Sequence, residues 1–433
     1  MSGLRGWRSE LVWTLGDPAS DVANLRHFED GLLLVDGARI VGAGAWSDLA
    51  PTLPEGVPVE HLPGRILTPG FVDGHIHFPQ LDMVASPGGA LLGWLERYTF
   101  PAERAFADPA HAKEAAGRFL NSLLANGTTT AMVFGSVHAE SVEALFEEAL
   151  ARDMRLIAGK CLMDQGPEGL RDTARGGAAE TQGLIRAWRG RGRLGYAVTP
   201  RFALGSSREQ LDLAGRLLAD NPDVWMQTHL SENAAEIEAT RQAFPEAADY
   251  LDVYDRFGLV SERSMFAHAI HLSDRELGRM GQARCACAFC PTSNLFLGSG
   301  LFDLERTLGF GVKVALGTDI GAGTSWSLLT TAAEAWKVGQ LKGTTLDPLT
   351  ALYMAGRGGA EALGLQDRIG SFEPGMEADF VVLDPGGVPG LGRHRAETLA
   401  ERLLALMVLG GDRAVERTYL AGRLAHGRQD SHA

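Results

Sequence analysis

Cysteine is scarce in this 433-residue chain, which has four, three of them at Cys285, Cys287 and Cys290. So few cysteines cannot form the disulfide framework of a secreted domain, and we expect buried structural thiols, not a thiolate metal site, in a cytoplasmic protein. Positive charge is also limited, since 40 Lys and Arg stand against 54 Asp and Glu without a long basic run. The net charge of −14 therefore excludes a nucleic-acid or anionic-membrane surface.

Long apolar runs are missing too. Nowhere do about 18 apolar residues follow one another, and the N-terminus lacks the apolar core of a signal peptide, so we expect neither a membrane span nor secretion. Hydrophobic residues nevertheless make up 45% and charged residues 22%, the balance of a globular protein and not of a disordered chain. The length predicts two or three domains, or one large α/β barrel with a smaller unit.

The two ends of the chain carry the pattern of a small β-unit. Short apolar runs alternate with turns such as Asp36-Gly37 near the N-terminus, and two more strand-like runs follow near the C-terminus. Neither end has enough apolar residues for its own core, so we predict one discontinuous β-sandwich from residues 1–67 and 371–433. The runs are Leu11–Leu15, Gly31–Val35, Ala38–Val41, Ala378–Leu383 and Thr418–Leu424.

Residues 68–370 alternate strand-like runs with segments of helical spacing, such as Ala110–Ala125, Val142–Ala151 and Arg208–Leu218. This alternation predicts an α/β fold in which eight parallel strands close into a (β/α)8 TIM barrel, with catalytic residues where the strands end. The predicted strands are Ile66–His77, Thr128–Gly135, Leu156–Met163, Leu194–Ala203, Val224–Leu230, Ser264–Leu272, Arg284–Pro291 and Lys313–Asp319.

Histidines gather at these strand ends. His75 and His77 lie two apart on the first strand and face the same side, although such a pair alone is as typical of a surface or a core. His229, His268 and Asp319 end three further strands, so the five residues together indicate a metal site. Imidazoles with a carboxylate suit zinc or Fe(II), with an open position for a water whose pKa falls to near 7.

Glu232 follows His229 by three residues, just beyond the fifth strand. From there its carboxyl group can approach a reacting atom without binding the metal, which predicts a general acid–base role. The alternative is a carboxylate that caps the start of the next helix.

Motifs along nearly the whole chain resemble the amidohydrolase superfamily and, within it, the guanine deaminases. The metal-strand motif and the Gly-Thr-Asp turn are shared across the superfamily, whereas Phe78-Pro-Gln80, Trp94–Pro101 and Pro200-Arg-Phe202 are more specific. The motifs are Pro69–Gln80, Trp94–Pro101, Thr199–Phe202, Gln227–Asn233, Cys290–Asn294, Gly317–Thr324 and Gly370–Leu383.

The resemblance implies that His75, His77, His229 and Asp319 hold one zinc ion, or iron, with His268 as a further ligand or a partner of the bound water. Related hydantoinases hold a second metal on a lysine of strand four. That strand has no lysine here, and Lys160 lies on strand three, so a single metal is favoured.

The resemblance also places Gln80 and Arg201 against the polar edge of a purine, with Phe202 beside the ring. A loop hydrogen bond for Gln80 and a structural ion pair for Arg201 are the alternatives. Two departures from the family pattern are the segment Ala203–Ser207 after Phe202 and the alanine that stands directly after His268, where a glycine is expected. His271, three residues after His268, is easily mistaken for a ligand.

The implied activity is hydrolysis of guanine to xanthine and ammonia by a cytoplasmic homodimer. Asp319, aided by His268, would take a proton from the attacking water, and Glu232 would protonate the ring nitrogen and then the departing amino group. Two alternatives stay open: a relative that deaminates a pterin, an 8-oxopurine or a triazine, and a non-catalytic scaffold on the same barrel.

Overall fold

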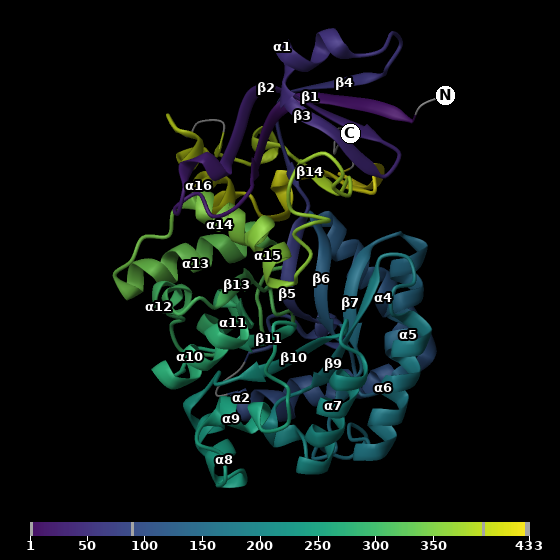
Figure 1. The fold of residues 1–433 in the computed structure, drawn as a ribbon, viewed down its shortest axis with the longest axis vertical. Helices are drawn as coiled ribbons and strands as arrows, with labels where there is room; N and C mark the ends of the chain where they lie inside the picture. Colours follow the sequence, from purple (N-terminus) through teal and green to yellow (C-terminus); the bar gives the residue numbers. More distant parts are fainter. Residues whose placement is uncertain (1–2, 88–90, 392–394, 429–433) are drawn as a thin grey trace.

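The computed structural model describes residues 3–87, 91–391 and 395–428, which form a barrel of parallel strands and a smaller sheet at one end of it (Figure 1). This architecture confirms the predicted α/β class and the pairing of the two chain ends in one unit. Among the helices of the described ranges, none is both long enough and apolar enough to cross a membrane.

Eight parallel strands form the nearly closed barrel, at the eight segments predicted from the sequence. Backbone hydrogen bonds join its first strand to the loop that follows its last strand: the Asp319 N–H donates to the His75 carbonyl over 2.9 Å, and the His77 N–H donates to the Ile320 carbonyl over 2.9 Å. The two-residue strand β8 (Cys161–Leu162) extends the third strand and pairs with β9. The eight strands are β5 (Phe71–His77), β6 (Thr128–Phe134), β7 (Arg155–Gly159), β9 (Leu194–Pro200), β10 (Trp225–Leu230), β11 (Ser264–His268), β12 (Ala286–Phe289) and β13 (Lys313–Leu316).

Helices cover the outside of the barrel, and six of the seven long ones begin at a residue whose side chain caps the first turn. In α4, for example, the Asp108 side chain accepts from the Ala110 N–H, and Pro109 occupies the first turn. The long helices are α4 (Pro109–Ala125), α5 (Ala139–Ala151), α6 (Ala174–Trp188), α7 (Arg208–Asp220), α8 (Ala234–Ala243), α10 (Asp274–Ala283) and α13 (Leu328–Lys342). The shorter ones are α2 (Leu91–Trp94), the π-helical turn η4 (Leu95–Thr99), α3 (Phe100–Arg104), α9 (Tyr250–Asp255), α11 (Pro291–Phe296), α12 (Leu304–Gly309), α14 (Pro348–Ala355) and α15 (Arg357–Ala362).

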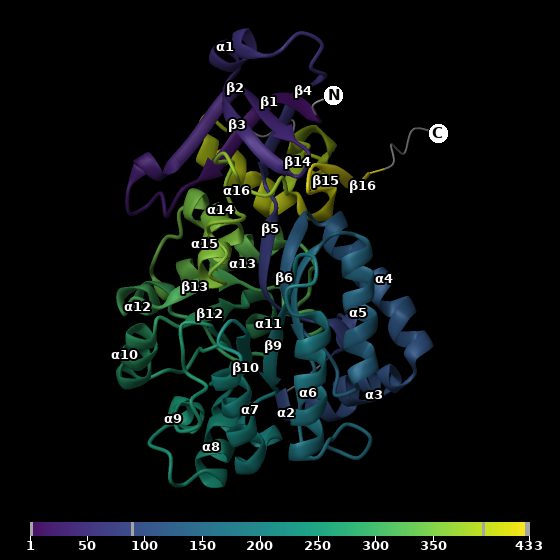
Figure 2. The same cartoon turned by 45° about the vertical axis from the view of Figure 1, so that its right-hand side comes forward.

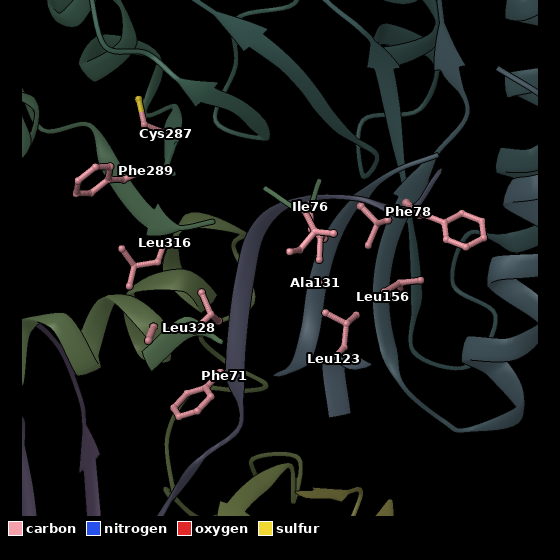
Figure 3. Packing of buried hydrophobic residues seen from close by; sticks show 14 of the residues in the cluster. Phe71, Ile76, Phe78, Leu123, Ala131, Leu156, Cys287, Phe289, Leu316 and Leu328 are labelled. Atoms are coloured by element: carbon pink, nitrogen blue, oxygen red, sulfur yellow. The ribbon is translucent and has the colours of Figure 1, made fainter. Parts of the chain in front are cut away.

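Apolar side chains of the strands and of these helices form the main core (Figure 3). Phe71 and Ile76 of β5 are fully buried, as are Ala131 of β6 and Leu123 of α4. Burial of one such large side chain stabilises the fold by about 1.5–3 kcal/mol. The core therefore holds the strand ends, and the side chains that they carry, in fixed positions.

The smaller sheet has seven strands in the order β16-β15-β14-β4-β1-β2-β3, so the predicted β-sandwich is built as one continuous sheet from both chain ends. Its hairpin at Asp36-Gly37 is confirmed, because Asp36 pairs with Arg39 across the turn. The strands are β1 (Leu4–Thr14), β2 (Leu25–Asp36), β3 (Arg39–Ala45), β4 (Val59–Pro69), β14 (Phe380–Leu383), β15 (Val415–Leu420) and β16 (Arg423–Gly427), with α1 (Trp46–Leu49) and α16 (Leu399–Leu409) beside them.

Two predicted strands are each divided in the structure. The segment Thr418–Leu424 is a hairpin, because Ala421 and Gly422 both have positive φ (47° and 74°) and form the turn between β15 and β16. The segment Ile66–His77 changes sheets at Gly70. A Cβ there would lie 2.0 Å from the Thr129 hydroxyl oxygen, so only glycine allows the chain to pass from β4 into β5.

Buried ion pairs connect the barrel to the smaller sheet. Arg155 donates through Nε to Glu377 Oε2 over 3.0 Å, and Arg193 donates through Nη1 to Glu377 Oε2 over 2.9 Å and to Asp379 Oδ2 over 2.7 Å. At most 11% of any of these four side chains is exposed. The opposite end of the barrel, where α2 lies in Figures 1 and 2, carries the predicted site residues.

Candidate active site

A pocket opens at the carboxyl ends of the barrel strands. Every predicted site residue except His75 lines it, and the apolar side chains of Leu91, Trp94 and Leu95 form part of its wall. The predicted residues in its lining are His77, Gln80, Arg201, Phe202, His229, Glu232, His268 and Asp319. The mixture of apolar and convergent polar groups is typical of a ligand site.

The first strand brings two histidines into the barrel. His75 and His77 of β5 are 1% and 3% exposed, and Gly74 stands before them because a Cβ there would lie 2.8 Å from the Ala315 Cβ on β13. Asp73 fixes the strand to the loop after β13. Its carboxylate accepts from the Thr318 hydroxyl over 2.5 Å and from the Thr318 and His75 N–H groups, while burial raises the pKa of Asp73 to about 7.

Five side chains converge on one point. His75 Nε2 lies 3.2 Å and His77 Nε2 lies 3.3 Å from Asp319 Oδ1, and the Nε2 atoms of His77 and His229 are 3.1 Å apart. Donor atoms of His75, His77 and Asp319 lie within 4.8 Å of one another, as do those of His75, His229 and His268. His75 belongs to both groups and therefore lies at the centre of the cluster.

Hydrogen bonds behind the cluster orient two of the imidazoles. The Arg201 carbonyl is an acceptor only, so His229 donates to it through Nδ1 over 2.6 Å and turns Nε2 toward the cluster. His268 Nδ1 lies 2.9 Å from the side-chain oxygen of Asn294, with the same consequence for its Nε2. Such partners of the outward nitrogen are typical of metal-binding histidines.

The backbone at these strand ends is locally strained. Ser231, His268, Ala269 and Asp319 have φ values between 48° and 67°, a region that residues other than glycine rarely occupy. Ser231 and Ala269 directly follow β10 and β11, His268 ends β11, and Asp319 lies three residues beyond the end of β13. Strain of this kind persists where surrounding contacts impose it, and it is common at functional sites.

The chemistry of the cluster fits a divalent metal. Burial lowers the pKa of His77 and His229 well below the usual value, which favours the neutral imidazole that a metal requires. Burial would raise the pKa of Asp319, but the neighbouring imidazoles outweigh it and lower that pKa. Nε2 of His75 is buried and makes no hydrogen bond within the described parts of the chain, although Asp319 is near. A buried nitrogen without a hydrogen bond, surrounded by further donors, is a position for a metal.

Glu232 lies beside this cluster and belongs to neither group of converging donors. Ser299 donates its hydroxyl to Glu232 Oε1 over 3.2 Å, and Glu232 Oε2 lies 3.5 Å from His268 Nε2. The Glu232 N–H donates to Glu236 Oε2 over 3.0 Å, and Glu236 in turn accepts from the Tyr250 hydroxyl over 2.6 Å. Burial raises the pKa of Glu232 to about 7.

Gln80 and Arg201 reach the pocket from two different loops and meet behind its wall. Gln80 lies in the 3₁₀ segment η3 (Phe78–Met83) and Arg201 directly follows β9; both are buried. Each donates to Glu103, Gln80 through Nε2 over 3.0 Å and Arg201 through Nη1 over 2.6 Å. Arg201 is therefore an ion-pair partner as well as a pocket residue, and Phe202 lies half-buried beside it.

His271 and Lys160 lie outside the cluster. His271 is exposed and donates through Nε2 to the Ser299 carbonyl over 2.8 Å. Lys160 is fully buried, and its Nζ contacts Asp172 at 2.5 Å and Glu180 at 3.3 Å. Neither residue is among the converging donors of the described chain.

Sequence reasoning did not single out five residues that support the site: Asp73, Glu103, Glu236, Asn294 and Ser299. Three of them had a signal, because Asp73 and Asn294 lie within motifs used for the resemblance and Glu236 completes a capping box with Asn233. Glu103 and Ser299 act across long stretches of sequence, and no local pattern marks them.

Comparison with known proteins places the chain. The model of the amidohydrolase family matches residues 66–425, which span the whole barrel and the C-terminal strands of the smaller sheet. The chain belongs to the amidohydrolase family. A guanine deaminase from Escherichia coli is 45% identical over 431 residues, covering 99% of this chain and 98% of that protein.

Solved structures agree with this assignment. The structure of the E. coli guanine deaminase superposes with a TM-score of 0.96 at 44% identity, covering 98% of this amidohydrolase and all of that chain. A guanine deaminase from C. acetobutylicum with guanine bound in its active site has a TM-score of 0.89 at 29% identity, covering 97% and 99% of the two chains. The likeness therefore extends over both the barrel and the smaller sheet.

Proposed function

We propose that this protein hydrolyses guanine to xanthine and ammonia. The observation that carries the proposal is one pocket whose lining includes Glu232, most of a cluster of metal-binding type and the polar pair Gln80 and Arg201. The full-length likeness to guanine deaminases, one of which is solved with guanine in its active site, supports the same substrate.

His75, His77, His229 and Asp319 would hold one metal ion, with His268 as a further ligand or a partner of the reacting water. Zinc is the proposed metal and Fe(II) the alternative, because both accept imidazole and carboxylate ligands. When bound, the metal supplies Lewis acidity, which brings the pKa of a water molecule near 7 and permits hydrolysis at neutral pH. Lys160 is held by Asp172, which favours a single ion.

The chain's own residues would move the protons. Oδ2 of Asp319, which lies 3.8 Å from His268 Nε2, accepts a proton from the attacking water. The water oxygen forms a bond to C2 of guanine, and Glu232 donates a proton to the ring nitrogen beside that carbon. The ionised Glu232 then takes the proton of the new C2 hydroxyl group and delivers it to the amino group, so that the C2–N bond breaks with neutral ammonia as the leaving group and C2 becomes a carbonyl carbon. The proton held by Asp319 passes back to Glu232 before the next cycle.

The rest of the pocket would position the purine. Arg201 offers only donors and suits the C6 carbonyl, Gln80 offers a donor and an acceptor, and Phe202 lies beside the ring. Adenine has an amino group at C6, which would meet the donors of Arg201 without an acceptor. Burial of unpaired donors is costly, so the pocket favours guanine over adenine.

A panel of guanine, adenine, pterins, 8-oxopurines and triazines, incubated with the zinc-loaded enzyme, tests this proposal through ammonia release. We expect guanine to be the best substrate. A pterin, an 8-oxopurine or a triazine exceeding guanine about tenfold in kcat/KM would favour the corresponding relative. No release of ammonia from any compound, together with a protein that binds no metal, would favour a non-catalytic scaffold.

Three broader predictions accompany this function. We propose that residues 1–67 and 371–433 form one domain and residues 68–370 the catalytic domain. Because all four cysteines are free and buried, we propose a reducing, cytoplasmic location. The proposed reaction would serve purine catabolism there. The homodimer implied by the family resemblance remains a prediction that sedimentation equilibrium can test.

A further inference from the structure

A single buried carboxylate joins the two polar residues of the pocket. Glu103 lies on α3 and is 1% exposed. Its Oε1 accepts from Nε2 of Gln80 over 3.0 Å, and its Oε2 accepts from Nη1 of Arg201 over 2.6 Å. Gln80 follows β5 and Arg201 follows β9, so Glu103 connects two loops that the sequence places far apart.

Glu103 provides the negative charge that keeps Arg201 in the pocket wall. The Arg201 side chain is 5% exposed, and its guanidinium carbon also lies 5.5 Å from the centre of the Phe100 ring. Burial alone would lower the pKa of Arg201, but the Glu103 carboxylate reverses this and raises it. Without that carboxylate, the guanidinium would be a buried cation without its counter-ion, free to turn toward other acceptors.

Glu103 also determines which end of the Gln80 amide faces which neighbour. An ionised carboxylate only accepts hydrogen bonds, so the amide nitrogen of Gln80 must face Glu103. The Gly321 N–H only donates, so Oε1 of Gln80 must face Gly321, from which it accepts over 3.3 Å. The two contacts together exclude the flipped amide. The donor and acceptor that Gln80 presents to a ligand are thus fixed before the ligand arrives.

We propose that Glu103 is a positioning residue that sets the substrate preference of the pocket, by fixing the hydrogen-bonding direction of both Gln80 and Arg201. The inference rests on the proposed function and deepens it, because it names the residue through which a 2-amino-6-oxopurine is preferred over a 2,6-diaminopurine. Both compounds lose the same amino group from C2, and they differ at C6 and at N1, which carries a hydrogen in guanine and accepts hydrogen bonds in 2,6-diaminopurine.

The test compares wild type with E103Q, which keeps the size of the side chain and removes its charge. An amide at this position can donate as well as accept, so Gln80 can flip and Arg201 loses its counter-ion. We expect KM for guanine and Kd for xanthine to rise at least about tenfold, the effect of losing a charge-assisted hydrogen bond, with kcat changed less than about threefold. We also expect the preference for guanine over 2,6-diaminopurine to fall about tenfold.

The matched control is E96Q, since Glu96 is exposed on the adjacent turn η4 and undergoes the same chemical change. It should leave KM, Kd and the preference unchanged. If E103Q is unfolded by circular dichroism, E103D, which keeps the charge but not the reach to both partners, should show the same loss of preference. Failure of both variants to fold, or equal loss of activity on both purines, would overturn the proposal by assigning Glu103 a structural role.

The failure of this inference can be told apart from failure of the proposed function. Wild-type turnover of guanine tests the function. The role of Glu103 is tested by comparing the preference for guanine over 2,6-diaminopurine, as a ratio of kcat/KM values, between E103Q and wild type. If wild type prefers another cyclic amidine, the preference for that compound over its 6-amino counterpart is compared between E103Q and wild type in the same way, and this ratio still decides the role of Glu103. An unchanged ratio there would again overturn the inference.

Discussion

Replacement of Glu232 by Gln separates proton transfer from every other property of the site. The amide has the same size, so Ser299 can still donate to its side-chain oxygen, and the backbone contact with Glu236 is unaffected. The principal change is that the group 3.5 Å from His268 no longer carries a proton that it can release. Because Glu232 is outside the converging donors, metal content should not change.

The expected loss of kcat follows from the number of proton transfers assigned to Glu232. General acid–base catalysis contributes roughly 10²–10⁴-fold to a rate, and Glu232 is assigned two transfers in one cycle, so we expect kcat to fall by about 10⁴-fold. That factor corresponds to about 5 kcal/mol of activation free energy. A neutral amide is less costly to bury than a carboxylate, so the free energy of unfolding should stay within about 1 kcal/mol of wild type.

The assay follows ammonia release, with metal content by elemental analysis and unfolding by circular dichroism on the same samples. Glu238→Gln is the matched control, because Glu238 lies exposed on α8, six residues further along the chain. It should retain full activity. A Glu232→Gln enzyme with more than about a tenth of the wild-type kcat, or one that has lost its metal, would refute the assigned role.

Further changes give distinct outcomes. His75→Ala and Asp319→Ala should each lose bound metal together with activity, whereas His271→Ala should keep both, as elemental analysis and the ammonia assay will show; metal loss in the His271 variant would contradict this placement. Arg201→Ala should raise KM for guanine and reduce the difference in kcat/KM between guanine and adenine, and an unchanged difference in kcat/KM would contradict the role of Arg201. Glu377→Ala, which removes the partner of two buried arginines, should lower the free energy of unfolding by about 3–5 kcal/mol in urea titrations, and a change below about 1 kcal/mol would count against that estimate.

The strands and the cluster could be predicted because both follow from local patterns. Alternation of apolar runs with helical spacing marks all eight barrel strands. Residues at the ends of parallel strands meet at one edge, so His75, His229 and Asp319 could be placed together without knowledge of the side-chain packing. The sequence also located Glu232 beside the cluster, because it follows a strand end directly.

Features that depend on packing between distant segments could not be predicted. The change of sheet at Gly70 depends on the nearness of Thr129, and the turn at Ala421-Gly422 interrupts an otherwise apolar run. Glu103 lies on a five-residue helix, and its importance arises only from contacts with Gln80 and Arg201. A buried carboxylate with such partners has no periodicity that a single sequence can reveal.

Hydrolysis of guanine at C2 is tested most directly by the reaction of the zinc-loaded enzyme in water enriched in oxygen-18. Mass spectrometry of the product and a parallel ammonia assay measure what is formed and in what proportion. We predict one molecule of xanthine for each molecule of ammonia, with one oxygen-18 atom at C2 of each xanthine. Absence of xanthine, or xanthine without the label at C2, would contradict the proposed function.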